Sequence, residues 1–156
     1  MNFSEITDSL LIGTMPRKRD YVLLRDLGVR LIINMRFSLA TRPGPKEPAM
    51  RYLWLRSIDS PLFPISLRAL IRGVHAALET INDGGKVYVH CAYGRHRSVA
   101  MGSAILIAQG LSPEAAMSLI KEKRAEADPD IFYIRRRILL FARQWAGNYH
   151  QHNLMV

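Results

Sequence analysis

Short apolar runs along the chain predict strands. They lie at 6–14 (ITDSLLIGT), 29–35 (VRLIINM), 52–55 and 87–91. Each run is short and bounded by turn or charged residues, which is typical of a buried strand. The first predicts one edge strand closed by Gly13, and the second predicts a central strand because it is apolar throughout.

Helical patterns separate these runs, and several have recognisable ends. Ser66 is a predicted N-cap and Gly84–Gly85 a predicted stop. Between them, one predicted helix face carries Leu67, Leu70, Ile71, Val74, Leu78 and Ile81. A shorter helix is expected to start at Pro16, present Tyr21, Leu24 and Leu27, and end at Gly28.

The second half of the chain predicts three more helices. Residues 99–108 (VAMGSAILIA) are too apolar for a surface helix, so we expect a buried one. Ser112-Pro113 predicts an N-cap and first turn for a helix towards Lys123. The last helix is predicted to begin near Asp128-Pro129, with Asp128 as its N-cap, and to bury Ile131, Ile134, Ile138, Phe141 and Trp145.

This order of elements predicts a single α/β domain over residues 1–156. We expect a central, mostly parallel sheet of four or five strands flanked by helices on both faces, with right-handed crossovers. Residues 37–50 and 56–64 are rich in proline and predict loops, and 147–156 predicts a flexible tail.

The charge of the chain indicates a class of partner but does not identify one partner within it. The chain has 22 Lys and Arg against 13 Asp and Glu, a formal charge of +9. This excess favours anionic partners such as phosphorylated proteins, phosphoinositide headgroups or nucleic acid. No leader or membrane-spanning run is evident, so we expect a cytoplasmic protein. As the oligomeric state we expect a monomer.

The candidate chemistry lies in 86–98, KVYVHCAYGRHRS. A strand that ends at Cys91 and turns directly into a helix places the sulfur at a helix N-terminus, which favours anions. Such a position, with nearby cations, lowers a thiol pKa from about 8.5 into the range of about 3.5–7.5. The N–H groups of Ala92 to Arg97 can form a nest for a tetrahedral oxyanion, and Arg97 can bind two of its oxygens.

Cys91 is the only cysteine. The chain therefore has no intramolecular disulfide and no cysteine-ligated zinc site, and any reversible oxidation requires a sulfenamide or an outside thiol. His150 and His152 could bind a metal but have no further ligand in sight. We expect neither a metal nor a cofactor.

The segment HCAYGRHRS resembles the HCxxGxxR[ST] loop of the cysteine-dependent protein tyrosine phosphatase superfamily, and the short chain resembles its small dual-specificity branch. The resemblance implies a dual-specificity phosphatase-like fold. It also implies attack of Cys91 on a phosphomonoester, a phosphocysteine intermediate and hydrolysis by water. Phosphotyrosine and phosphoserine/threonine in proteins are the expected substrates.

Asp59 lies in the loop RSIDSPLFP, upstream of Cys91. Ester cleavage needs a proton for the departing alkoxide or phenoxide. In the dual-specificity family a movable loop carries an aspartate at a similar upstream distance, so the resemblance implies that Asp59 is the general acid. Turn chemistry before Ser-Pro is the alternative explanation for this aspartate.

The remaining loop residues have separate expected roles. The resemblance implies that His90 organises the loop, and Gly94 allows a positive φ and close approach to a ligand. Ser98 could donate to the sulfur and favour the thiolate. Tyr93, Arg95 and His96 would form the floor and rim of the pocket, where they either recognise the substrate or point to solvent.

Several alternatives stay open. A rhodanese-type sulfurtransferase also uses a loop cysteine, but its loop is usually a residue shorter and Asp59 would have no function. An inactive phosphate-binding module is the non-enzyme alternative. Low-molecular-weight tyrosine phosphatases use a downstream Asp-Pro acid, but their cysteine lies near the N-terminus. Phosphoinositides and RNA 5′-phosphates remain possible substrates.

Overall fold

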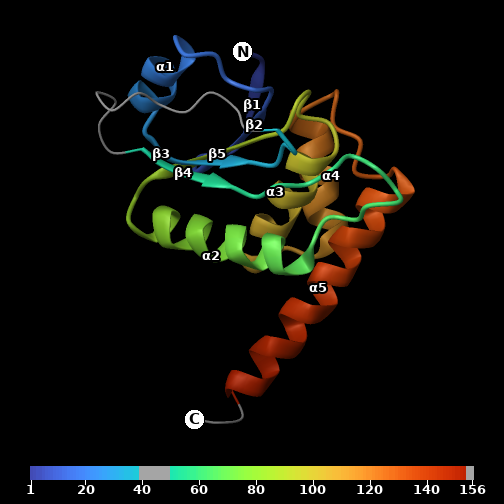
Figure 1. Ribbon diagram of the computed structural model, residues 1–156. Helices are drawn as coiled ribbons and strands as arrows, with labels where there is room; N and C mark the ends of the chain where they lie inside the picture. Colours follow the sequence, from blue (N-terminus) through green and yellow to red (C-terminus); the bar gives the residue numbers. More distant parts are fainter. Residues whose placement is uncertain (39–49, 154–156) are drawn as a thin grey trace.

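Five strands form one sheet, and their order in the sheet differs from their order in the chain. In the computed structural model, which describes residues 1–38 and 50–153 with side chains as far as 147, they lie in the order β1-β2-β5-β3-β4 (Figure 1). The strands are β1 Phe3–Thr7, β2 Leu10–Gly13, β3 Val29–Asn34, β4 Arg51–Trp54 and β5 Lys86–His90. β2 and β3 run parallel to β5, β4 runs parallel to β3, and β1 is antiparallel to β2.

Helices cover both faces of the sheet, as the sequence predicts. They are α1 Asp20–Asp26, α2 Leu67–Asn82, α3 Arg97–Ala108, α4 Pro113–Lys123 and α5 Phe132–Asn153. Alternation along β5 shows why two layers form: Val87 and Val89 join the large core under α2, α3 and α5, whereas Tyr88 joins the smaller core that buries Tyr21 of α1. Figure 1 shows α1 alone on its side of the sheet.

Local caps form where the sequence predicts them. The Ser66 side chain accepts a hydrogen bond from the Ala69 amide, and the Ser112 side chain accepts one from the Ala115 amide. Gly28 has a φ of 89° after α1. The α3 helix is buried along almost its whole length, which confirms the prediction from its composition.

Two predicted boundaries are wrong. The run 6–14 is not one edge strand: Thr7 Oγ1 accepts hydrogen bonds from the Ser9 and Leu10 amides, and this turn separates edge strand β1 from interior strand β2. Pro16 lies before α1, not in its first turn.

The second half contains one more correction. α5 begins at Phe132, so Asp128 is not its N-cap. The Ile131 carbonyl accepts the first bonds of this helix from Ile134 and Arg135. The helix continues to Asn153, whereas 154–156 and the side chains of His150 and His152 lie outside the described residues, as does most of the predicted loop 37–50. The flexible tail stays a prediction.

Candidate active site

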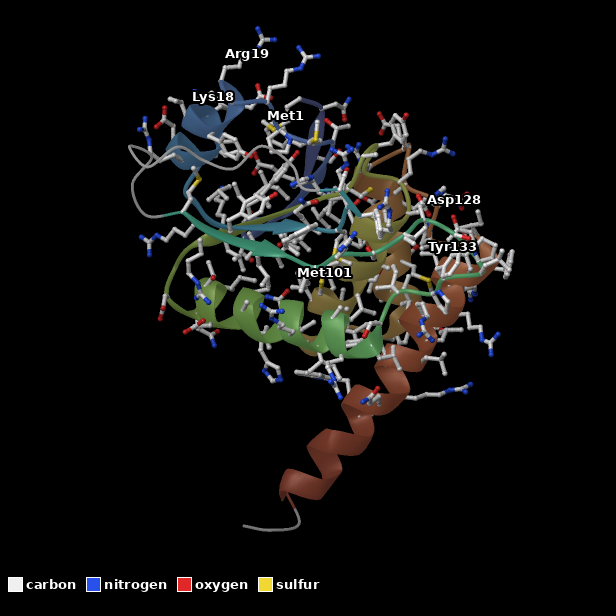
Figure 2. The ribbon with its side chains drawn as sticks, in the orientation of Figure 1. Met1, Lys18, Arg19, Met101, Asp128 and Tyr133 are labelled. Atoms are coloured by element: carbon white, nitrogen blue, oxygen red, sulfur yellow. The ribbon has the colours of Figure 1, made fainter. Side chains whose placement is uncertain are left out.

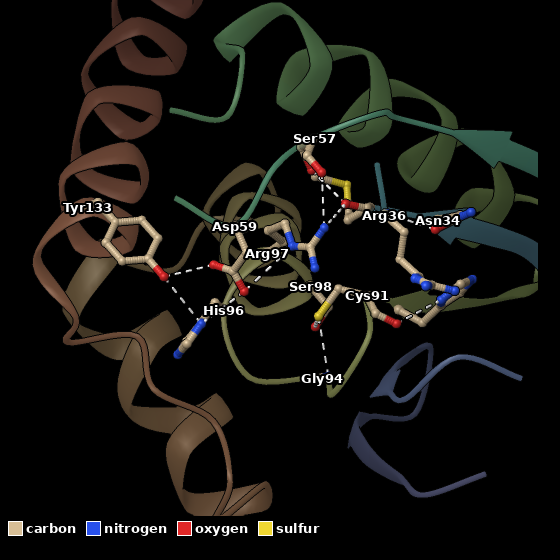
Figure 3. Close-up of polar contacts among 12 residues, drawn as sticks. Asn34, Arg36, Ser57, Asp59, Cys91, Gly94, His96, Arg97, Ser98 and Tyr133 are labelled. Carbon is tan, nitrogen blue, oxygen red and sulfur yellow. Dashed lines mark hydrogen bonds and ion pairs between the residues drawn. The ribbon is translucent and has the colours of Figure 1, made fainter. Parts of the chain in front are cut away.

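Cys91 lies where β5 ends, at the edge of the sheet where the four parallel strands have their carboxyl ends. Its side chain is buried, and the five residues 92–96 lead from it to Arg97, the first residue of α3. The Gly94 amide donates a hydrogen bond to Cys91 Sγ over 3.3 Å, and Ser98 Oγ lies 3.3 Å from the same sulfur (Figure 3). The loop therefore curls around the sulfur.

These contacts determine the ionisation of the thiol. Burial alone raises the pKa of Cys91, but the Ser98 hydroxyl and amide, the Arg97 charge and the Gly94 amide all stabilise the thiolate. Their combined effect exceeds the effect of burial, so the pKa of Cys91 lies below its ordinary value. A lowered pKa gives a larger fraction of nucleophilic thiolate at a given pH.

Gly94 adopts the positive φ that the sequence predicts, with a value of 68°. A Cβ atom at this position would lie 2.7 Å from Arg124 Nη2 and 2.8 Å from the Gly13 carbonyl oxygen. Both the conformation and the close packing therefore require glycine here.

Arg124 supports the loop from beneath, and no sequence motif indicated it. Its side chain is almost completely buried, with Nε donating to the Gly94 carbonyl over 2.8 Å and Nη2 to the Tyr93 carbonyl over 3.1 Å. The Asp128 amide donates to the next carbonyl, that of Arg95. Three successive carbonyls are thus bound outside the loop, which leaves loop amides such as that of Gly94 free to face the sulfur.

Arg97 is anchored at one end and open at the other. Its Nη1 donates to the carbonyl oxygens of Met35 and Ser57, over 3.2 Å and 3.0 Å. Its Nε is buried and has no hydrogen-bond partner among the described residues, although Asp59 Oδ2 lies 3.7 Å away. A buried donor without a partner costs free energy. An anion beside Cys91 would supply the missing acceptor for Arg97 Nε.

Asp59 faces this site from the loop between β4 and α2, as the sequence predicts. Tyr133 Oη donates to Asp59 Oδ1 over 2.7 Å, and His96 Nδ1 lies 3.1 Å from Asp59 Oδ2 (Figure 3). Burial and the neighbouring Asp59 charge raise the pKa of Tyr133 to about 12, so its hydroxyl keeps the proton that it donates. Figure 2 shows Tyr133 near the start of α5. Sequence patterns gave no sign of this contact.

His90 is fully buried beneath the loop. Its Nδ1 lies 3.2 Å from the Cys91 carbonyl oxygen, which can only accept, so Nδ1 is the donor. Burial and, to a lesser degree, the Arg36 charge lower the pKa of His90 to about 4, against the smaller opposing effect of its bond to the Cys91 carbonyl. The ring is therefore neutral and donates to the carbonyl of the next residue, Cys91, while its role in organising the rest of the loop stays a prediction.

The variable loop positions differ in their surroundings. Tyr93 is 75% exposed and Arg95 is exposed, whereas Ala92 is half-buried. His96 is also half-buried and contacts Asp59 and Tyr133. The structure thus brings His96 to the predicted acid, while a substrate role for Tyr93 and Arg95 stays a prediction.

The described part of the chain shows neither a metal-ligand cluster nor a helix that could span a membrane. Over residues 1–38 and 50–147, no group of three or more His, Cys, Asp or Glu side chains is placed to hold a metal ion. No helix in the described part of the chain is long and apolar enough to cross a membrane.

The Cys91 thiol has a lowered pKa and lies beside the Gly94 and Ser98 amides and the Arg97 guanidinium, which Asp59 faces. This arrangement on an α/β fold is typical of cysteine-dependent phosphatases. The sequence matches no protein-family model. It is 30% identical to mouse dual specificity phosphatase 28 over 131 residues, 83% of this chain and 77% of that protein. It is 35% identical to rat phosphatidylglycerophosphatase and protein-tyrosine phosphatase 1, over 79% of this chain and 67% of that protein.

Solved structures agree with these relatives. The crystal structure of PTPMT1 in complex with PI(5)P superimposes with a TM-score of 0.83 at 26% identity, over 94% of this chain and 98% of that one. The chain belongs to the dual-specificity branch of the protein-tyrosine phosphatases and is a cysteine-dependent phosphatase.

Proposed function

We propose that this chain is one catalytic domain that hydrolyses phosphomonoesters without a metal, through a phosphocysteine intermediate. The observation that carries the proposal is the surroundings of Cys91 Sγ: an amide donor and a hydroxyl lie 3.3 Å from it, beside the buried Arg97 guanidinium, whose Nε has no hydrogen-bond partner within residues 1–38 and 50–147. These groups stabilise negative charge on the sulfur and on a phosphoryl group next to it. In phosphoryl transfer, positioning and electrostatics supply most of the rate.

In the first step the Cys91 thiolate attacks phosphorus, and the ester P–O bond breaks as the S–P bond forms. Arg97 and the amides of Ala92 to Arg97 hold the phosphoryl oxygens. Asp59 gives its proton to the departing oxygen and becomes a carboxylate. Its position 3.7 Å from Arg97 Nε, at the side of the anion site, supports this role.

In the second step Asp59 accepts a proton from a water molecule, whose oxygen attacks phosphorus as the S–P bond breaks. Cys91 leaves as a thiolate, and phosphate is released. The Ser98 hydroxyl, 3.3 Å from the sulfur, can donate to the departing thiolate. His90 stays neutral and supports the loop without entering the proton transfers.

The substrate that we propose is a phosphorylated protein, with tolerance for phosphotyrosine and phosphoserine or phosphothreonine. The Asp59 side chain is 29% exposed and Tyr93 is 75% exposed, so the groups around the anion site are open to solvent. An open site admits phosphoryl groups on both short and long side chains. The expected monomer and cytoplasmic location stay predictions.

A lipid phosphomonoester, such as a phosphoinositide, is the second candidate. A groove of about 500 Å³ borders the Asp59 loop and combines exposed apolar side chains with a cation; Phe37, Arg56, Ile58 and Phe63 are among its lining residues. Leu62, at the tip of that loop, is 80% exposed. Apolar tips beside cations are typical of proteins that contact anionic lipid surfaces. An RNA 5′-phosphate is supported by charge alone.

The first experiment is turnover of p-nitrophenyl phosphate by the wild type in the presence of EDTA. We expect metal-independent release of phosphate, and its complete loss in Cys91→Ser, which still binds phosphate. Absence of turnover by wild type would remove the hydrolase proposal and leave a phosphate-binding module. Sulfur transfer from thiosulfate to cyanide instead would indicate a sulfurtransferase.

A second experiment separates the substrates. Wild type and Leu62→Ser are compared on phosphotyrosine and phosphothreonine peptides, on phosphoinositide in vesicles and on 5′-phosphorylated RNA. A phosphoprotein enzyme turns over the peptides best and is indifferent to Leu62→Ser. Preference for vesicles, reduced by Leu62→Ser while turnover of p-nitrophenyl phosphate is unchanged, would favour the lipid candidate.

A further inference from the structure

The carboxyl group of Asp59 is held by two side chains from different elements. Tyr133, in the first turn of α5, donates to Oδ1 over 2.7 Å. His96, the residue before Arg97 in the catalytic loop, lies 3.1 Å from Oδ2 and 3.3 Å from the Tyr133 oxygen. The three groups therefore form a closed triangle of hydrogen bonds (Figure 3).

Donors and acceptors in this triangle are determined when Asp59 is ionised. A carboxylate only accepts, so the single Tyr133 proton points to Oδ1 and a His96 Nδ1 proton points to Oδ2. The Tyr133 oxygen can then accept from the same Nδ1. All three contacts are satisfied together in the carboxylate form, which is the form that Asp59 takes after it has given up its proton.

The two carboxyl oxygens consequently have different surroundings. Oδ1 is occupied by Tyr133 on the α5 side, whereas Oδ2 is the atom 3.7 Å from Arg97 Nε, at the anion site. A second bond from α5 to the same loop, from Arg137 Nε to the Ile65 carbonyl over 2.7 Å, fixes its far end. The Asp59 loop is thus bound to α5 both at Asp59 and at its far end.

We propose that Tyr133 and His96 are positioning residues for the general acid, and that Tyr133 leaves Oδ2 as the oxygen that gives and takes the proton. This inference rests on the proposed function and adds two residues to it. It also assigns His96 to the acid instead of to substrate recognition. During the first step the Oδ2 proton goes to the leaving oxygen, and the new negative charge on Asp59 is stabilised by the Tyr133 hydroxyl and His96.

The test compares kcat/KM for phenyl phosphate, a poor leaving group, with that for p-nitrophenyl phosphate, which needs little protonation. Because kcat/KM covers the steps up to P–O cleavage, it reports the acid step directly. Loss of one hydrogen bond to a charged group predicts that Tyr133→Phe lowers kcat/KM for phenyl phosphate about tenfold and changes that for p-nitrophenyl phosphate much less. His96→Leu should behave like Tyr133→Phe, and His96→Asn, which keeps a donor near the Nδ1 position, should recover most of the loss.

A double-mutant cycle separates positioning from a structural effect. In an Asp59→Ala background, Tyr133→Phe should have no further effect on either substrate. Arg137→Met is the matched control, since it removes another bond from α5 to the same loop without touching Asp59, and it should affect both substrates equally. Equal losses on both substrates for Tyr133→Phe, or a further loss in the Asp59→Ala background, would overturn the inference.

The outcomes distinguish this inference from the proposed function. If wild type hydrolyses neither ester, the proposed function fails. If Asp59→Ala impairs phenyl phosphate selectively and Tyr133→Phe does not, only the positioning role fails.

Discussion

The loop 91–97, which carries Cys91, and the loop 56–65, which carries Asp59, meet at one site but are held in different ways. The Cys91 loop is fixed through its backbone: a buried arginine and a backbone amide bind three of its carbonyls, and a glycine with positive φ lets it curl around the sulfur. The Asp59 loop is bound at its backbone near its ends, at the Ser57 and Ile65 carbonyls. Between them the Asp59 side chain itself is held by Tyr133 and His96, and the tip of the loop is exposed.

Because of this difference, we expect contacts of the Cys91 loop to affect the stability of the fold and contacts of the Asp59 carboxyl group to affect catalysis. Buried backbone contacts contribute to folding, because removing them leaves polar groups without partners in the interior. Contacts at a half-exposed carboxyl group contribute little to folding but determine where a proton can go. Changes in the Asp59 loop should therefore alter rate alone, whereas changes beneath the Cys91 loop should alter stability and rate together.

The largest expected effect comes from Asp59→Asn. A positioned acid contributes about 10²–10⁴ in rate, so kcat/KM for phenyl phosphate should fall by a factor in this range, with a much smaller loss for p-nitrophenyl phosphate. The free energy of unfolding should change by less than about 0.5 kcal/mol, because the side chain is at the surface. Asp130→Asn, at an exposed ion pair with Lys121, is the control and should leave both rates unchanged. A uniform loss across leaving groups would argue against Asp59 as the acid.

Arg124→Met should have the next largest effect, on stability. The substitution leaves the buried Gly94 carbonyl and the partly buried Tyr93 carbonyl without their partner, at a cost of about 4 kcal/mol in the free energy of unfolding, measured by urea denaturation. Turnover should fall in parallel because the loop amides lose their support. Arg143→Met, at an exposed position on α5, should change stability by less than about 0.5 kcal/mol. If Arg124→Met were as stable as wild type, the buried contacts would not explain the rigidity of the Cys91 loop.

His90 predicts a pH dependence of stability. In the folded chain the pKa of His90 is lowered to about 4, whereas the unfolded chain has the ordinary value of 6.5. Above pH 6.5 the ring is neutral in both states; below it only the unfolded chain takes up the proton, so stability falls as the pH falls towards 4. The loss approaches about 3 kcal/mol. Urea denaturation of wild type and His90→Asn should show this slope in wild type alone; parallel pH profiles would contradict it.

Sequence patterns predict those structural features that depend on contacts between residues close together in the chain. Ser66 and Ser112 cap their helices through contacts with residues three positions away, so the neighbouring residues in the sequence are enough to predict both caps. The Asp128-Pro129 pair has the same appearance but does not begin α5, which starts at Phe132; the Asp128 amide instead binds the Arg95 carbonyl, a long-range contact that the local pattern does not reveal. The turn at Thr7 also depends on neighbouring residues, but the apolar residues on both sides of it hide it within one predicted strand.

The candidate site divides in the same way. Cys91, Gly94, Arg97 and Ser98 belong to one short segment whose spacing predicts an anion site. Tyr133 and Arg124 have no such signal: Tyr133 is 74 residues from Asp59 in the chain, and Arg124 is 30 residues from Gly94. Only the packing of α4 against β1, and of α5 against α2 and α3, brings them to the loops, so single-sequence patterns could not identify them.

Chemical trapping of the intermediate shows directly whether Cys91 is the nucleophile. Wild type is quenched in acid during turnover of p-nitrophenyl phosphate, digested and analysed by mass spectrometry. We expect one added phosphoryl group on the peptide that contains Cys91. It should survive the acid quench, be lost under conditions that cleave phosphorus–sulfur bonds, and be missing from Cys91→Ser. Turnover by Cys91→Ser, or rapid turnover by wild type with the phosphoryl group on another residue, would contradict it.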